Sequence, residues 1–288
     1  MEKNLKFVHK LSEKEIVEVK QLEKKNKDDR NIYYKLCPQS LDGTDESVYH
    51  ILFREQGRLT AYMSLSTYDI EEMEITPIFN GDKDKFLEMY QLAIDKAKQF
   101  KAKKILAIVD ENDSSMIGIL NDLGLNYTFS EYRMVFDKRD YQPTVESISI
   151  DNELSIRDAS SEDMRQVAYL DQNGFRCSGE FSYEDMGDAN LTDIKLALWK
   201  NNIIGKIKVE ENDGVFAIYG FVIDPNYRRR GFGKKFLKII IDSILKTDYK
   251  ELYLEVVSEN IAAYNLYISF GFNKQSTFNY YEYELNNE

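Results

Sequence analysis

Positive charge and glycine are concentrated in one short stretch of an otherwise acidic chain. The sequence DPNYRRRGFGKKFL occupies positions 224–237, whereas the formal net charge of the chain is −12. A turn that leads into a helix presents backbone N–H groups without internal partners at the positive end of the helix dipole. Gly231 and Gly233 lack Cβ atoms, so a phosphate can approach the backbone closely. The pattern predicts anion binding, with charge added by four side chains: Arg228, Arg229, Arg230 and Lys234.

Two common phosphate-binding loops do not fit this stretch. A nucleoside-triphosphate loop needs Gly-x-x-x-x-Gly-Lys followed by Ser or Thr, and the turn is too short for it. The dinucleotide fingerprint needs a third glycine, which would fall at Phe236. The structural alternative is a plain basic surface turn.

A second segment, ENIAAYNLYISFGF, follows the next predicted strand. Together the two segments resemble the acetyl-coenzyme A signatures of the GNAT superfamily of N-acetyltransferases. The first signature is Arg228-x-x-Gly231-x-Gly233 after an antiparallel strand that ends in Asp-Pro. The second consists of Asn260, Ala263, Leu266, Tyr267, Gly271 and Phe272. The resemblance covers residues 153–285.

The resemblance implies a site for acetyl-CoA as co-substrate and no metal. In this family the strands AIYGFVI and LYLEVV splay apart and the cofactor inserts between them. The backbone of Phe221, Val222 and Ile223 would pair with the pantetheine arm. The amides from Arg228 to Lys234, including Phe232, would hold the pyrophosphate. Asn260 would lie near the arm, although it could instead be an ordinary helix cap, and Arg229 could be a solvated surface charge.

Resemblance gives Tyr267 the role of general acid for the leaving thiolate or of a hydroxyl that positions the thiol. A thiol pKa near 8.5 lies below the roughly 10 of tyrosine, so proton donation is feasible but weakly driven. The alternative is core packing, because Tyr267 shares a helix face with Ala263, Leu266 and Phe270.

The general base stays open at this point. Some family members carry a glutamate on the strand before the arginine turn, and the corresponding position here is Ala217. Tyr219 lies on the same strand face by the period of two. Three carboxylates could relay a proton through water: Glu210, Glu211 and Glu255. Neither cysteine falls in the two signatures, so direct attack by the amine is the simpler mechanism.

Composition narrows the class of protein further. The acidic balance argues against nucleic acid as a partner and mildly favours a cationic acceptor such as an amine, or it simply maintains solubility. No apolar run approaches the roughly 18 residues that would span a bilayer. Cys37 and Cys177 are too far apart for a zinc-ligand spacing, and only His9 and His50 accompany them. We therefore expect a cytoplasmic protein without a metal or a membrane partner, as a monomer or homodimer.

The second half predicts the elements that position the turn. A strand near ELSIRD precedes a helix capped by Ser160 and Asp163. Alternating apolar residues, broken at Asn201-Asn202 and at Asn212-Asp213-Gly214, predict a three-stranded antiparallel meander. The helix GKKFLKIIIDSILK follows the glycines, and then come the strand ELYLEVV, the helix IAAYNLYISF and a closing strand TFNYYEYEL.

The first half repeats this order and suggests an internal duplication. Ser12 and Glu15 form a capping-box pattern, and the hairpin VYHILFREQGRLTAYMSLSTYD turns near Gly57. Aligning NGDKDKFL with RRGFGKKFL places Ile78 opposite Arg228 and Asp82 opposite Phe232. The tyrosine position becomes Ile119 or Leu120. We therefore expect a degenerate copy that keeps the fold and has lost the cofactor site.

These patterns predict an α/β (α+β mixed sheet) fold with two tandem GNAT-like domains. The degenerate domain covers 1–140 and the N-acetyltransferase domain covers 150–288. The predicted function is acetyl transfer to a primary amine of a small molecule or peptide. The alternative is a non-catalytic acyl-CoA-binding or regulatory protein. Acidic residues within 169–191 could meet a cationic acceptor or form a solvated face: Glu180, Glu184 and Asp185.

Overall fold

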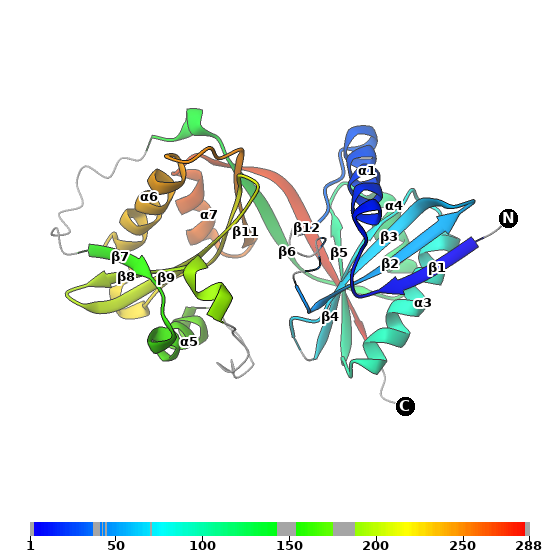
Figure 1. The fold of residues 1–288 in the computed structure, drawn as a ribbon, viewed down its shortest axis with the longest axis horizontal. Coiled ribbons are helices and arrows are strands. Elements are labelled where there is room, and N and C mark those ends of the chain that lie inside the picture. Colours follow the sequence, from blue (N-terminus) through cyan, green and yellow to red (C-terminus); the bar gives the residue numbers. More distant parts are fainter. Residues whose placement is uncertain are drawn as a thin grey trace. The chain divides into compact units, whose positions relative to one another are not determined.

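The computed structural model describes residues 3–36, 41, 43, 45–69, 71–142, 154–174 and 188–285. The chain divides into two compact units (Figure 1). Unit 1 comprises Met1–Tyr132 together with Ser276–Glu288, and unit 2 comprises Arg133–Gln275. Both cysteines and the three carboxylates at 180, 184 and 185 lie outside the described residues.

Unit 1 is a mixed sheet with helices on both faces. Its elements are β1 (Lys3–Val8), α1 (Glu13–Arg30), β2 (Val48–Glu55), β3 (Arg58–Ser66), β4 (Glu72–Ile78), α3 (Lys83–Gln99), β5 (Lys104–Asp110), α4 (Ser114–Asp122) and the first part of β6 (Asn126–Phe136). Strands β1 to β4 pair antiparallel, and β4 and β5 pair parallel. One residue before α1, Ser12 closes the predicted capping box with Glu15.

Alternation along the strands of unit 1 separates two apolar cores. Leu52 and Tyr62 pack with Val19 of α1, whereas Phe53 and Met63, one residue further along each strand, pack with α3 and α4. Because successive side chains of a strand point to opposite faces, α1 covers one face of this sheet and α3 and α4 cover the other. This is the layer arrangement expected of an α/β unit whose sheet is buried on both sides.

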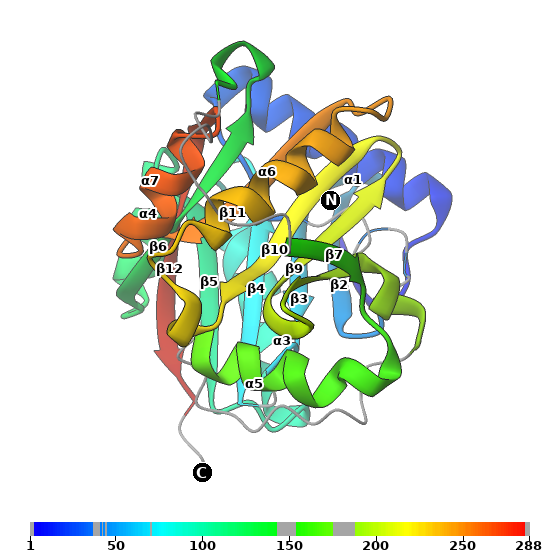
Figure 2. The same cartoon turned by 90° about the vertical axis from the view of Figure 1, so that its left-hand side faces the viewer.

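Unit 2 repeats the same element order. Its elements are β7 (Leu154–Asp158), α5 (Met164–Gly174), β8 (Ile194–Trp199), β9 (Asn202–Asn212), β10 (Val215–Ile223), α6 (Phe232–Ile244), β11 (Glu251–Val257), α7 (Ile261–Ile268) and the start of β12 (Phe272–Glu284). Strands β7 to β10 are antiparallel neighbours, and β10 pairs parallel with β11. Figure 2 faces unit 2, with α6 in orange and α5 in green on either side of these strands.

The last strand of each half of the sequence contributes to both units. The later residues of β12, Phe278–Glu284, pair antiparallel with β5 inside unit 1. The end of β6 belongs to unit 2, where it neighbours β11 and where Arg133 pairs with Glu251 at 3.1 Å. The compact units therefore differ from the ranges 1–140 and 150–288 at residues 133–140 and 276–288. As boundaries of functional domains, those ranges remain a prediction.

Most of the predicted local structure is present. The predicted meander corresponds to β8, β9 and β10, with turns at the predicted positions. Strand β1 was not expected, although Lys6 alternates with the apolar Leu5 and Phe7 as in a strand, because the apolar pattern is only a few residues long. Among the described helices, none is both long and apolar enough to cross a bilayer.

Candidate functional site

Strands β10 and β11 separate in the middle of unit 2. Their parallel pairing begins at Val215 with Glu251 and ends at Ile218 with Leu254. Both strands continue beyond this point, to Ile223 and Val257. The backbone groups of the last residues of β10 therefore face a gap on the β11 side, as the resemblance implies for residues 221–223.

A bulge in β10 lies where this gap begins. The register with β9 shifts between Tyr219 and Val222, and Gly220 adopts φ +54°, a conformation that favours glycine. A Cβ at Gly220 would lie 3.4 Å from Nζ of Lys206, which pairs with Asp171 of α5 at 2.6 Å. Burial raises the pKa of Asp171 above its usual value. This buried ion pair fixes α5 against the bulge.

The arginine–glycine turn delivers the chain from β10 to α6 as predicted. A short 3-10 turn, Pro225–Tyr227, is capped by Asp224, and α6 then begins at Phe232. Gly231 is the N-cap with φ 86°, and no side chain caps the helix. The first helical bond runs from the Lys235 amide to the Gly231 carbonyl at 3.1 Å. The amides of the three residues before Lys235 are thus available at the positive end of a helix of 13 residues.

The arginines of the turn have different environments. Arg228 donates from Nε to the Ile223 carbonyl at 2.8 Å and from Nη2 to the Asn173 carbonyl at 3.4 Å. It therefore ties the turn to the ends of β10 and α5, besides adding charge. Arg229 is exposed and has φ 60°. The guanidinium of Arg230 lies over the Trp199 ring, 4.7 Å from its centre.

Polar side chains occupy one face of the sheet beside the gap. Across the β9–β10 pair, Glu210 lies opposite Ala217 and Lys208 lies opposite Tyr219. Glu210 and Lys208 form an ion pair. The Tyr219 hydroxyl lies 3.2 Å from the Tyr253 hydroxyl. In the register of β10 and β11, Tyr253 lies opposite Ala217. Tyr219 is thus on the predicted face, at the first position of β10 beyond its pairing with β11.

The three carboxylates considered as proton relays are separated by the structure. Glu255 lies two residues after Tyr253, hence on the same face, with Arg133 at 3.8 Å. Arg133 also lies 3.8 Å above the Tyr253 ring. Glu211 faces the other way and accepts a bond from the Gly214 amide at 2.7 Å. Glu210 and Glu255 therefore remain candidates, whereas Glu211 is a turn residue.

The two predicted residues of α7 have distinct surroundings. Tyr267 is 6% exposed and meets the Phe272 ring edge-on at 5.9 Å. Burial raises the pKa of the Tyr267 phenol above its usual value. Asn260 accepts from the Ala263 amide at 3.2 Å and caps α7. The cap role of Asn260 is thus observed, and it leaves the side-chain amide nitrogen to donate to a ligand.

Two other features of unit 2 do not contribute to this site. In the part of the chain that the structure describes, no His, Cys, Asp and Glu side chains gather in a group of three that could hold a metal. An open depression lies at the opposite end of β10, lined by residues that include Glu211, Phe216 and Thr247. It follows the C-terminal end of α6, so it is remote from the helix start.

Comparison with known proteins identifies this arrangement. Residues 157–272 match the model of the acetyltransferase (GNAT) family. This part of the chain is a GNAT domain. Over 58 residues the chain is 40% identical to [ribosomal protein bS18]-alanine N-acetyltransferase of Escherichia coli (strain K12), a match that covers 20% of this chain and 39% of that protein. The chain thus spans well under half the length of the curated relatives it matches.

Solved structures extend the likeness to both units. A tandem GNAT protein from the clavulanic acid biosynthesis pathway has a TM-score of 0.72 at 12% identity, covering 99% of this chain and 100% of that one. A GCN5-related N-acetyltransferase from Sphaerobacter thermophilus has a TM-score of 0.65 at 14% identity, covering 82% of this chain and 80% of that one. The predicted tandem GNAT fold is therefore confirmed.

Sequence reasoning missed three residues around the GNAT turn and gap. Tyr253 was not predicted because its register with β10 is set by a parallel crossover, which no local pattern reveals. Trp199 and Tyr227 are close to Arg230 in space, yet Trp199 lies on another strand. Composition alone could have drawn attention to Trp199, because it is the one tryptophan of the sequence.

Proposed function

We propose that the chain is an acetyl-CoA-dependent N-acetyltransferase whose reaction takes place in unit 2. The acceptor is a primary amine of a small molecule or a peptide. The observation that carries the proposal is the pairing of an open gap after Ile218 and Leu254 with a glycine-capped helix start at Gly231. The gap offers unpaired strand backbone to an extended arm, and the helix start offers amides to phosphates.

Charge around the helix start fits a diphosphate. The amides of Phe232, Gly233 and Lys234 precede the first helical bond, and the turn is rich in cations. Each helix-dipole contact contributes about 0.3–1 kcal/mol at an exposed site, so several amides must act together. The Arg228 side chain supports the turn through its bonds to carbonyls of residues 223 and 173, which holds these amides in place.

Transfer would proceed by direct attack of the amine nitrogen on the thioester carbonyl carbon. The C–N bond forms, the C–S bond breaks, and the electron pair leaves on sulfur. The Tyr267 hydroxyl donates a hydrogen bond to the departing sulfur and passes its proton to the thiolate, and the phenol then regains a proton from solvent. Burial raises the pKa of this phenol, which keeps it protonated before the reaction but also makes it a weaker acid. The amine loses a proton through water to a carboxylate, for which Glu255 and Glu210 lie on the face of Tyr219. Tyr219 itself would help to place the amine.

Unit 1 would not bind the cofactor in this proposal. The start of α3 is occupied by its own N-cap, since the Asp82 side chain accepts from the Lys85 amide. Unit 1 would therefore be the degenerate copy. We further propose that the protein is cytoplasmic, is a monomer or homodimer, and does not act on nucleic acid.

The decisive experiment is a thiol-release assay with acetyl-CoA over a panel of amines and N-terminal peptides. We expect Tyr267→Phe to lower kcat by about 100-fold at saturating acetyl-CoA, because a positioned acid contributes about 10²–10⁴-fold. Calorimetry should give the same CoA affinity for both proteins, and far-UV circular dichroism the same fold. Tyr264→Phe, also on α7, is the matched control and should retain kcat.

The rival function, a non-catalytic acyl-CoA-binding protein, predicts a different result. CoA would bind with the expected affinity, but no amine would release thiol above the background. Unchanged kcat in Tyr267→Phe would remove the acid role while leaving the transferase. Absence of CoA binding by the unmodified chain would overturn the proposal itself.

A further inference from the structure

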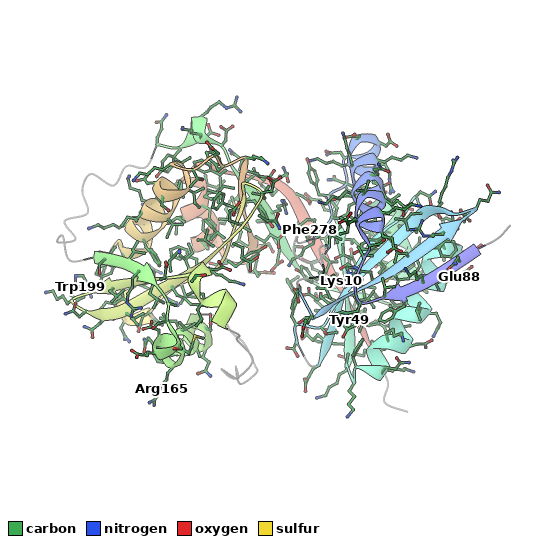
Figure 3. The ribbon with its side chains drawn as sticks, in the orientation of Figure 1. Lys10, Tyr49, Glu88, Arg165, Trp199 and Phe278 are labelled. Atoms are coloured by element: carbon green, nitrogen blue, oxygen red, sulfur yellow. The ribbon has the colours of Figure 1, made fainter. Side chains whose placement is uncertain are left out.

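An aromatic cluster surrounds one arginine of the GNAT turn. The guanidinium carbon of Arg230 lies 4.7 Å from the centre of the Trp199 ring, 5.0 Å from that of Phe232 and 5.5 Å from that of Tyr227. The rings also contact each other, with Trp199 5.5 Å from Phe232 and 5.9 Å from Tyr227. Figure 3 labels Trp199 at the end of β8.

The cluster joins two elements that are far apart in the sequence. Trp199 ends β8, the strand next to the edge strand β7, whereas Tyr227 and Phe232 flank the turn. Phe232 is buried and is the first residue of α6. The Arg230 side chain is therefore held directly beside the helix start, where the amides of residues 232–234 are available.

Stacking on aromatic rings preserves the hydrogen-bonding capacity of a guanidinium. Ring faces attract the cation, and the five N–H donors lie in the guanidinium plane, where they remain directed outward. Among the ion pairs of the described residues, none involves Arg230. A free arginine loses considerable rotamer freedom when it binds a ligand. An arginine that the rings already hold has lost part of that freedom beforehand.

We propose that Trp199 is a positioning residue that holds Arg230 in place for a phosphate oxygen of the acyl-CoA co-substrate. This inference rests on the proposed function. Trp199 does not itself need to touch the ligand. Its effect passes through Arg230, so the two residues should behave as one unit in binding.

Lys200 provides a matched control on the same ring. Its Nζ lies 4.7 Å from the centre of the Trp199 ring. Lys200→Met removes one cation from the cluster without removing the ring that holds Arg230. If general positive charge near the turn were the whole effect, Lys200→Met and Arg230→Met would weaken binding equally.

The test is calorimetric titration of the full chain with CoA, dephospho-CoA and pantetheine. We expect Trp199→Leu and Arg230→Met each to weaken CoA binding by about tenfold, the value of one charge-assisted hydrogen bond. The double variant should lose no more CoA affinity than the more strongly affected single variant. Trp199→Phe should recover most of the affinity, and Lys200→Met should stay within about threefold of the unmodified chain. Pantetheine, which lacks the phosphates, should bind all variants equally.

Because Trp199 is the one tryptophan, its fluorescence provides a second measurement on the unmodified chain. Emission should change as CoA saturates the protein, and Arg230→Met should reduce that change. Dephospho-CoA, which lacks the 3′-phosphate, shows which phosphate Arg230 binds. If the variants lose as much affinity for dephospho-CoA as for CoA, Arg230 binds the diphosphate. If they lose no affinity for dephospho-CoA, Arg230 binds the 3′-phosphate.

Two results would overturn the inference. If the unmodified chain binds CoA and Trp199→Leu keeps its affinity, Trp199 does not position Arg230, while the proposed function stands. If the losses in the two single variants add in the double variant, the residues act independently. Failure of the unmodified chain to bind CoA would overturn the proposed function together with this inference.

Discussion

Helix α3 in unit 1 and helix α6 in unit 2 each follow a strand that separates from its parallel partner. Pairing ends at Ile75 with Ala107 in unit 1 and at Ile218 with Leu254 in unit 2. The helix starts differ: a carboxylate, Asp82, caps α3, whereas α6 has a bare glycine. A carboxylate cap both satisfies an amide and repels a phosphate. The N-cap residue is thus one difference between the two helix starts that bears directly on anion binding.

The region beyond the separated strands also differs. In unit 1, Arg30 at the end of α1 donates to the Phe79 carbonyl at 3.2 Å and to Asp113 at 2.7 Å. These bonds connect α1, the end of β4 and the cap of α4. In unit 2 the corresponding end of α5 carries Gly174, whose missing side chain leaves room for Val222. In unit 1 an arginine of the helix thus bonds to a carboxylate, Asp113, whereas in unit 2 the arginine of the turn, Arg228, bonds to backbone carbonyls of β10 and α5.

The largest expected effect concerns how each unit completes its sheet. A fragment of residues 150–288 lacks Arg133, which pairs with Glu251 and covers the Tyr253 ring in unit 2. It also separates Phe278–Glu284 from their β5 partners. We expect this fragment to be unfolded or aggregated, and circular dichroism and gel filtration would show it. A soluble, folded fragment that binds CoA would contradict this.

The next largest effect is expected when a carboxylate, as found at the start of α3 in unit 1, is introduced at the start of α6 in unit 2. Gly233→Asp places a carboxylate in the first turn of α6, where the helix tolerates it but a diphosphate does not. A Cβ there meets only ordinary contacts, 3.5 Å from Ile223 and 3.7 Å from Phe221. We expect CoA affinity to fall by about 100-fold in calorimetry, because amide contacts are lost and repulsion is added. Gly233→Ala is the control and should lose much less; equal losses would show that bulk, not charge, is responsible.

Much of the fold follows from local patterns. The breaks at Asn201-Asn202 and Asp213-Gly214 predict the meander because such residues adopt the left-handed conformations of tight turns. The structure has these conformations at Asp213-Gly214 and, one residue earlier than the predicted pair, at Lys200-Asn201. The exchange of the final strands could not be predicted in this way. The alternation of apolar and polar residues along β12 suits many partner strands, and its pairing with β5 depends on long-range packing.

The parts of the candidate site that lie close together in the sequence could be predicted, and the parts that the fold brings together from distant segments could not. The spacing of Gly231 and Gly233 is enough to predict the start of a helix there. The cap role of Asn260 was an open alternative, and the bond from Ala263 shows it; a place near the pantetheine arm stays a prediction. The pairing of Arg230 with Trp199 depends on the approach of the β8 end to the turn, which no periodicity encodes.

The acid stability of the two units should also differ, because both histidines lie in unit 1. His50 is 0% exposed, and burial lowers its pKa to about 4. Its folded pKa lies below its unfolded value of about 6.5, so the unfolded chain binds a proton first as the pH falls. We therefore expect the free energy of unfolding to drop by up to about 3 kcal/mol between pH 6.5 and 4.

His50→Gln should flatten this pH dependence, and His9→Gln, at an exposed position, should not. Denaturant unfolding at a series of pH values measures it. Buried carboxylates with raised pKa values, such as Asp113, act in the opposite direction but are common to all variants and cancel in the difference. Parallel curves for the unmodified chain and His50→Gln would show that His50 is not the responsible group.

The smallest effect tests whether the cap alone separates the two units. Asp82→Ala should cost about 1 kcal/mol of unfolding free energy and Asp82→Gly only a few tenths, since glycine is a tolerable N-cap. Neither variant, nor Asp82→Gly combined with Asp84→Lys, should add a second CoA site, because Arg30 still joins Phe79 to Asp113 and unit 1 has no counterpart of Tyr267. Calorimetric stoichiometry decides the matter. Two CoA molecules per chain in the combined variant would mean that the helix cap governs binding by itself, and that the bonds of Arg30 have no part in it.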